Sequence, residues 1–105
     1  MKIAVSTDER TPLVESLLHE LQERGHDVTY FGPERDESMD WPVVTERAAQ
    51  LVASGEAEEG IVMCWTGTGA SITANKIKGV RAALCRDSAT AKGARTWNHS
   101  NVLAL

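Results

Sequence analysis

The chain has 105 residues, of which 11 are Lys or Arg and 15 are Asp or Glu. This length fits one domain, residues 1–105, and is short for a self-sufficient enzyme, so an oligomer with shared sites is favoured. No basic block occurs in the sequence, which argues against a nucleic-acid-binding role.

The N-terminus and the cysteines narrow the class of protein further. The first ten residues contain one lysine and an apolar run of four residues, too short for a signal peptide or a membrane span. We therefore expect a cytoplasmic protein. Cys64 and Cys85 form no CxxC pair and have no histidine at zinc spacing, so neither a disulfide framework nor a structural metal site is supported.

The first predicted elements are a strand and a well-delimited helix. Residues 2–5 are an apolar run typical of a buried strand. Residues 11–26 predict a helix with Thr11 as N-cap, Pro12 at its first position and Gly25 past its end. Four leucines are expected on its buried face: Leu13, Leu17, Leu18 and Leu21.

The next segments continue the alternation. Residues 27–32 predict a second strand, the turn-rich polar residues 32–40 a loop, and residues 41–56 a second helix with Pro42 near its start. The inner side of this helix is expected to carry four apolar residues: Val44, Ala48, Leu51 and Val52.

The second half of the chain predicts three more strands and two more helices: strands over 60–64, 80–85 and 101–105, and helices over 68–76 and 87–98, the last with Asp87 as its cap. Strands that alternate with helices through short links imply right-handed crossovers and a parallel sheet. The predicted fold class is α/β, a Rossmann-like three-layer α/β/α sandwich with a five-stranded parallel sheet.

In open sheets of this kind, ligands bind outside the carboxyl ends of the strands, where the strand order reverses. If the first and third strands are neighbours, residues 6–10 and 64–69 form opposite lips of one crevice. That arrangement would place Asp8 and Cys64 in the same pocket.

Residues 66–71, TGTGAS, supply unhindered backbone N–H groups at a helix start, which suit a phosphate or an oxyanion formed during a reaction. The same pattern also fits a nucleotide site or a plain tight turn. Ile72 stands where the third glycine of GxGxxG would be, and no GKS or GKT follows, so a dinucleotide cofactor and a P-loop are disfavoured.

Cys64 stands at the carboxyl end of the third strand, directly before this loop. The helix start beyond it would favour the thiolate, the form that acts as a base. The alternative is a buried apolar cysteine that ends a core strand. Cys85 ends the fourth strand in similar style and is interpreted as structural.

Residues 60–87, GIVMCWTGTGASITANKIKGVRAALCRD, are similar to the signature of the ribose 5-phosphate isomerase B / galactose 6-phosphate isomerase family. The resemblance continues through AKGARTWNHSNVLAL, residues 91–105. It is supported upstream by KIAVSTDE, residues 2–9, and by DWP, residues 40–42. It therefore covers nearly the whole chain.

The resemblance implies aldose–ketose isomerisation of a phosphorylated sugar, with ribose 5-phosphate to ribulose 5-phosphate as the expected reaction. The reaction would pass through a cis-enediolate without a metal or an organic cofactor. A proton beside a carbonyl is weakly acidic, so a base and a stabiliser of the oxyanion must act together. The resemblance also implies a homodimer, or a dimer of dimers, in which the partner subunit completes each site.

The resemblance assigns roles by position. Cys64 matches the cysteine that moves the proton between C1 and C2, Thr66 the threonine beside it, and Asp8 the aspartate that contacts sugar hydroxyls. Asn98 matches the asparagine contributed by the other subunit. The loop amides match the anion hole for the enediolate, with these candidates: Gly67, Thr68, Gly69, Ala70 and Ser71.

Several positions depart from the family pattern. Glu9 replaces a histidine that helps to hold phosphate, and its carboxylate would repel that group. Trp97 occupies the place of the histidine proposed to open the sugar ring; His99, two positions later, either takes over this acid–base role or is a surface histidine. Trp65 replaces a glycine and is expected to line the pocket, to stack on the sugar or to change which substrate fits. Trp41 replaces a tyrosine and either walls the same cavity or packs in the core.

The family continues past residues 101–105 into a further helix with arginines that clamp the phosphate. We expect that the sequence is an incomplete version of a longer protein, that phosphate is held differently, or that it is not held at all. Arg10, beside the first strand, is the candidate substitute cation. Asn75 and Lys76 are expected to fix the short helix and the turn after it.

Two other functions stay open. Glu9, Trp97 and the absent arginine clamp motivate a noncatalytic or partner-dependent sugar-phosphate-binding subunit. Trp65 and Glu9 motivate an isomerase that acts on an unusual or unphosphorylated sugar.

Overall fold

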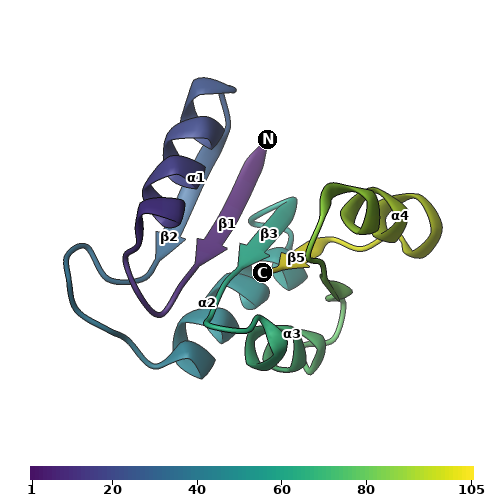
Figure 1. The fold of residues 1–105 in the computed structure, drawn as a ribbon. Helices are drawn as coiled ribbons and strands as arrows, with labels where there is room; N and C mark the ends of the chain where they lie inside the picture. Colours follow the sequence, from purple (N-terminus) through teal and green to yellow (C-terminus); the bar gives the residue numbers. More distant parts are fainter.

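A parallel sheet of five strands forms the centre of the molecule (Figure 1). The structure, a computed structural model, describes residues 1–105. The strands stand in the order β2-β1-β3-β5-β4, and every neighbouring pair is parallel. Their bounds are β1 Lys2–Ser6, β2 Asp27–Phe31, β3 Glu59–Val62, β4 Ala82–Leu84 and β5 Val102–Ala104.

Helices cover both faces of the sheet, so the predicted three-layer α/β/α sandwich is confirmed. The helices are α1 Pro12–Glu23, α2 Trp41–Ser54, α3 Thr68–Asn75 and α4 Ser88–Asn98. Figure 1 shows α1 and α4 on one face and α2 and α3 on the other. The two cores follow from the alternation of side chains along a strand: Ala4 packs in the core beneath α2 and α3, whereas its neighbours Ile3 and Val5 pack against α1.

The helix starts are those that the sequence predicts. The hydroxyl of Thr11 accepts a hydrogen bond from the Val14 N–H at 3.3 Å, with Pro12 at the first helical position. The carboxylate of Asp87 accepts one from the Thr90 N–H at 2.7 Å. Both contacts satisfy a backbone donor that has no partner within the helix.

The expected role of Asn75 at the end of the short helix is also confirmed. Its side chain donates to the Ala82 carbonyl at 2.9 Å and accepts from the Ala82 N–H at 2.8 Å. Asn75 therefore fastens the end of α3 to the start of β4.

Two expectations about buried helix faces were wrong in part. Leu13 is 63% exposed and Leu17 is half-buried, while the buried stripe of α1 consists of Val14, Leu18 and Leu21. These three are spaced by four and three residues and share one side of the helix, whereas Leu13 lies about 100° around the axis from Val14. In α2 Leu51 is half-buried, and the inner side also carries two small residues: Thr45 and Ala49.

Most strands are shorter than predicted at their ends. β4 was expected over 80–85 but runs from Ala82 to Leu84. The Arg81 N–H donates to the side chain of Asn101 at 2.7 Å, so Arg81 does not continue the ladder of backbone bonds. Similarly, β3 ends at Val62, two residues before Cys64, which leaves Cys64 on the loop that follows.

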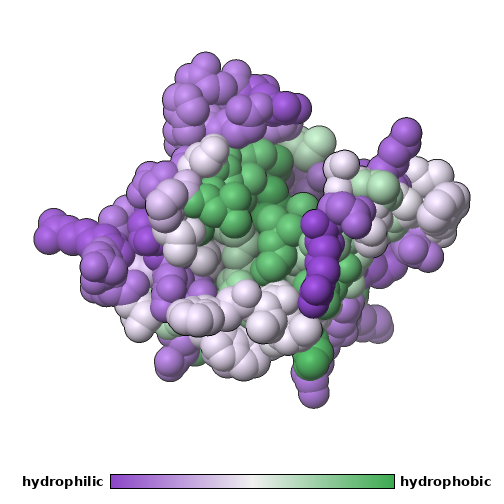
Figure 2. Space-filling model, in the orientation of Figure 1, coloured by the Kyte–Doolittle hydropathy of each residue, from purple (hydrophilic) through white to green (hydrophobic).

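One strip of the sheet has no helix over it. Figure 2 shows an apolar surface between α1 and α4. The half-buried side chains of Ile61, Leu103 and Leu105 belong to this part of β3 and β5 and the residue after it. None of the helices is both long and apolar enough to cross a membrane.

Candidate active site

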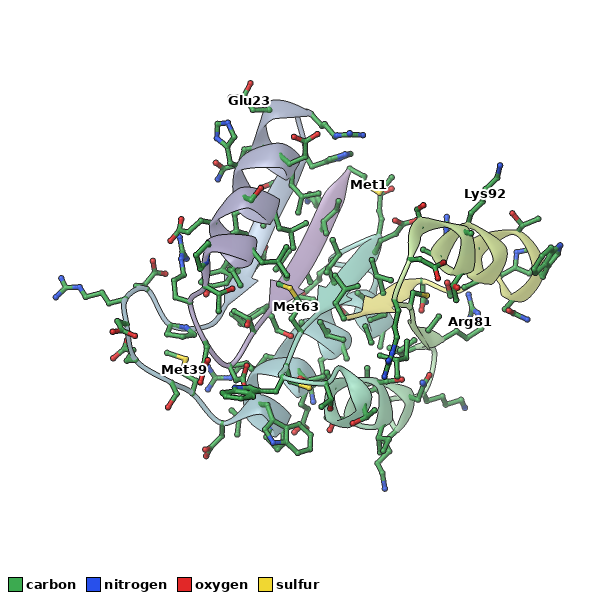
Figure 3. All side chains as sticks on the ribbon, viewed as in Figure 1. Met1, Glu23, Met39, Met63, Arg81 and Lys92 are labelled. Atoms are coloured by element: carbon green, nitrogen blue, oxygen red, sulfur yellow. The ribbon has the colours of Figure 1, made fainter.

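The candidate site lies where β1, β3 and β5 end side by side. β1 and β3 are neighbours, as the crevice prediction requires, with Ser6 opposite Val62. Two backbone hydrogen bonds extend this alignment past the strands: Met63 N–H donates to the Ser6 carbonyl at 2.8 Å, and Cys64 N–H donates to the Leu105 carbonyl at 3.2 Å. Figure 3 shows Met63 at the middle of the molecule and Met39 on the loop that leads to α2.

Two cavities open at this edge, and both are lined by Asp8, Cys64 and Trp65. The first, which we call the apolar cavity, has a volume of about 340 Å³ and is completed mainly by residues from α1 and the strand ends: Thr7, Glu9, Thr11, Leu13, Val14, Met63 and Leu105. The second, which we call the loop cavity, has a volume of about 330 Å³ and is completed by Trp41, Thr66, Thr68 and Gly69. Asp8 and Cys64 therefore line common cavities.

The backbone of the glycine loop is held in one shape. Gly67 has φ of 75°, the left-handed region that favours glycine, and its carbonyl accepts the Ser71 N–H at 2.9 Å in the first turn of α3. The hydroxyls of Thr66 and Thr68 are 2.7 Å apart. At the start of α3 the N–H groups of the first turn have no acceptor within the helix, so they are free to bind an anion.

The remaining loop candidates differ in their exposure. Gly69 is exposed, Ser71 is half-buried and Ala70 is fully buried. Only a backbone N–H of Ala70 is therefore a plausible contact for a ligand, since its methyl group packs in the core with α2.

The acidic lip of the crevice is fastened to the loop before α2. Thr7 donates from its hydroxyl to the Glu9 carbonyl at 2.9 Å, and Met39 N–H donates to the Asp8 carbonyl at 2.9 Å. Glu9 also pairs with Ser38 through an isolated antiparallel bridge. Burial raises the pKa of the Asp8 carboxyl, and the charge of Glu9 raises it further, against the opposing effect of backbone hydrogen bonds.

Arg10 has partners outside the crevice. Its guanidinium donates to both carboxylate oxygens of Glu15, at 2.6 and 3.1 Å, and lies 5.0 Å from the centre of the Tyr30 ring. The hydrogen bonds to Glu15 raise the already high pKa of Arg10. Arg10 lines neither the apolar cavity nor the loop cavity, so its use as a phosphate ligand stays a prediction that requires these contacts to break.

The chain was then compared with known proteins. The family model described as Ribose/Galactose Isomerase matches residues 3–105.

The chain belongs to the ribose/galactose isomerase family.

Individual members of this family match the whole chain. A galactose-6-phosphate isomerase subunit from Clostridium acetobutylicum is 40% identical over 106 residues. A D-erythrulose-4-phosphate isomerase from Pectobacterium atrosepticum is 36% identical over 107 residues. Each match covers 100% of this chain, but 61% of the first relative and 70% of the second.

A solved structure of ribose-5-phosphate isomerase B from Clostridium thermocellum superposes with a TM-score of 0.94 at 42% identity. The match covers 100% of this chain and 72% of that one. The Rossmann-like fold of the chain is therefore the fold of this family member.

Asn98 and His99 lie at the opposite edge of the sheet from Cys64 of the same chain. They follow α4 and precede the amino end of β5, and the Arg81 side chain, just before β4, donates to the His99 carbonyl at 2.9 Å. His99 has φ of 53°, a left-handed conformation at the end of α4. One chain by itself therefore does not bring these two predicted site residues to its own crevice.

Sequence reasoning missed some residues that line the crevice. Thr7, Met63 and Leu105 line the apolar cavity, and so does Leu13, which was expected in the core. For Thr7 and Met63 the signal was available, since each lies next to a predicted site residue. For Leu105 the only signal would have been the pairing of β3 with β5, which the sequence does not state. No cluster of three or more His, Cys, Asp or Glu side chains has the arrangement of a metal site.

Proposed function

We propose that the chain forms the catalytic crevice of an aldose–ketose isomerase for a phosphorylated sugar, with ribose 5-phosphate to ribulose 5-phosphate as the reaction. The observation that carries the proposal is the cavity shared by Cys64 and Asp8 beside a glycine loop at a helix start. Members of the family named for ribose 5-phosphate, galactose 6-phosphate and erythrulose 4-phosphate support the class of substrate.

In the proposed reaction Cys64, as the thiolate, removes the proton from C2 of the open-chain aldose. The electrons of the C2–H bond form a C1=C2 double bond, and those of the carbonyl move to its oxygen, which gives the enediolate. The first-turn N–H groups of α3 stabilise the negative oxygen. The Cys64 thiol then returns the proton to C1 while the proton of the C2 hydroxyl moves to O1, which leaves a ketone at C2.

The other residues have supporting roles in this proposal. Asp8 accepts hydrogen bonds from sugar hydroxyls, and the Thr66 hydroxyl lies beside the reacting carbons. Asn98 and His99 act in the crevice of a partner subunit, which is consistent with their position at the edge of the sheet away from their own Cys64. This last point also supports a partner-dependent subunit as a second candidate function.

The test is deuterium incorporation from heavy water, followed by NMR, with three sugar phosphates: ribose 5-phosphate, galactose 6-phosphate and erythrulose 4-phosphate. Free pentoses and hexoses complete the panel. We expect deuterium at C1 or C2 of one of these sugars and none with Cys64→Ala. Cys85→Ala is the matched control, since Cys85 is buried and lines neither cavity of the crevice. Unchanged exchange in Cys64→Ala would refute the role of the thiol, and no exchange with any sugar would favour the partner-dependent function.

A further inference from the structure

Trp65 is the most exposed large apolar side chain of the molecule, at 83%. It directly follows Cys64 and lines both the apolar cavity and the loop cavity. Trp is a large residue that is highly buried on average, so an indole exposed to this extent is informative. Its position beside the candidate base, between two cavities, indicates a surface that a ligand covers.

Trp41 provides a second aromatic wall of the loop cavity. It is the first residue of α2 and is 40% exposed. A Cβ added at Gly69 would lie 2.8 and 2.9 Å from two atoms of the Trp41 ring, closer than such atoms approach in proteins. The ring of Trp41 therefore lies directly on the backbone of the glycine loop, and the absence of a side chain at Gly69 makes this contact possible.

The polar walls of the loop cavity complement these rings. The carboxylate of Asp8 is an acceptor, and the hydroxyls of Thr66 and Thr68 both donate and accept. Small-molecule sites are typically apolar and aromatic with a few placed polar groups, and their volumes begin at roughly 300 Å³. A cavity of about 330 Å³ with two indoles, one carboxylate and two hydroxyls suits one monosaccharide, which presents C–H groups on its faces and hydroxyls at its edge.

We propose that Trp65 is a specificity-determining residue that packs against the C–H face of the sugar bound in the loop cavity, with Trp41 as the fixed aromatic wall. This inference rests on the proposed sugar isomerase function and names the residue that selects its substrate. Trp65 covers the sugar on binding and thereby loses its contact with water. Because the packing acts on bound substrate and transition state alike, Trp65 lowers KM with little effect on kcat.

The kinetic test compares Trp65→Ala, Trp65→Phe and the unchanged protein in the deuterium-exchange assay. We expect Trp65→Ala to raise KM by roughly tenfold, the size expected when about 1.4 kcal/mol of binding is lost, with kcat changed by less than about threefold. Trp65→Phe keeps an aromatic ring and should recover most of the loss. Ile72→Ala is the control: Ile72 is 61% exposed and lines neither cavity, so its KM should not change.

The binding test does not depend on turnover. The double variant Trp41→Phe/Trp97→Phe leaves Trp65 as the single tryptophan, since the chain has three. Ribitol 5-phosphate, which has no carbonyl and does not react, should shift the Trp65 emission to shorter wavelength in a saturable way. Inorganic phosphate alone should give no shift, because the proposed contact is with carbon rather than phosphate.

The outcomes separate this inference from the function on which it rests. If exchange occurs but Trp65→Ala has an unchanged KM, or ribitol 5-phosphate leaves the Trp65 emission unshifted, the inference is overturned while the isomerase function stands. If no sugar exchanges but Trp65 reports saturable binding of the polyol phosphate, the isomerase function fails and the aromatic sugar contact stands. If ribitol 5-phosphate does not bind at all, the contact is refuted. Because Trp65 is so exposed, its variants should unfold at the same temperature as the unchanged protein, and a large decrease would also contradict the described position of Trp65.

Discussion

The glycine at position 67 offers the sharpest test of how the loop is built. Gly67 has φ of 75°, and a Cβ placed there would lie 2.6 Å from Leu84 Cδ1, 2.7 Å from the Leu105 carbonyl carbon and 2.9 Å from its oxygen. The Leu84 side chain can shift, but Leu105 is held on both sides. Its N–H donates to the Val62 carbonyl at 3.0 Å, and its own carbonyl accepts the Cys64 N–H.

Two costs are expected for Gly67→Ala. A left-handed conformation costs a residue with a Cβ about 1 to 2 kcal/mol, and overpacking against fixed atoms costs about 1 to 3 kcal/mol. The free energy of unfolding should therefore fall by about 2 to 5 kcal/mol. Gly55 is the matched control, because it has φ of 82° but nothing lies within 4 Å of an added Cβ. Gly55→Ala should cost only the first part, about 1 to 2 kcal/mol.

The assay is urea unfolding of both variants, with stability taken from the midpoint and slope of each curve. The change in unfolded-chain entropy from glycine to alanine is common to both variants and cancels in the difference. Equal losses for Gly67→Ala and Gly55→Ala, within about 0.5 kcal/mol, would refute the close packing of the loop on Leu105. In the exchange assay, Gly67→Ala should also lose turnover, because displacing the Leu105 carbonyl moves the backbone of Cys64, whereas Gly55→Ala should keep it.

Three further results are expected. His99→Gly should raise the free energy of unfolding by about 1 kcal/mol, because glycine adopts the left-handed conformation of this helix end without strain; a lower urea midpoint would contradict this account. Asp8→Asn should stabilise the chain at neutral pH, since burial and Glu9 raise the pKa of Asp8 and its ionised form opposes folding. That gain should disappear as the pH falls through the raised pKa toward the ordinary value, and a gain that grows in acid would refute the sign. Iodoacetamide should modify native Cys64 well before Cys85, which is 3% exposed and whose pKa is raised by burial; equal rates measured by mass spectrometry would contradict the burial of Cys85.

The parts of the fold that the sequence predicts correctly depend on local chemistry. Thr11 and Asp87 cap their helices through atoms within three residues, so their roles follow from the sequence alone. The alternation of strand and helix is likewise local, and it implies the parallel sheet through the handedness of crossovers. The fate of Leu13 is different, because its exposure depends on how α1 is rotated against the sheet.

The site shows the same limit. The shared crevice of Asp8 and Cys64 follows from one topological assumption, that β1 and β3 are neighbours, and the assumption is correct. The engagement of Arg10 with Tyr30 depends on the position of β2 beside β1, and the contact of Trp41 with the loop joins elements that are far apart in the sequence. Such contacts arise from tertiary packing, which residue spacing does not encode.

The position of Cys64 and Asn98 at opposite edges of the sheet has a genetic consequence. If each crevice takes Asn98 from a partner subunit, a chain with Cys64→Ala and a chain with Asn98→Ala are each inactive alone. In a mixed dimer of the two, one crevice carries both defects and the other carries neither. Mixing equal amounts of the two inactive proteins should then restore about a quarter of the unchanged protein's activity, because a twofold dimer pairs each crevice with one partner. Two defective alleles of this gene would thus complement each other within a single cell.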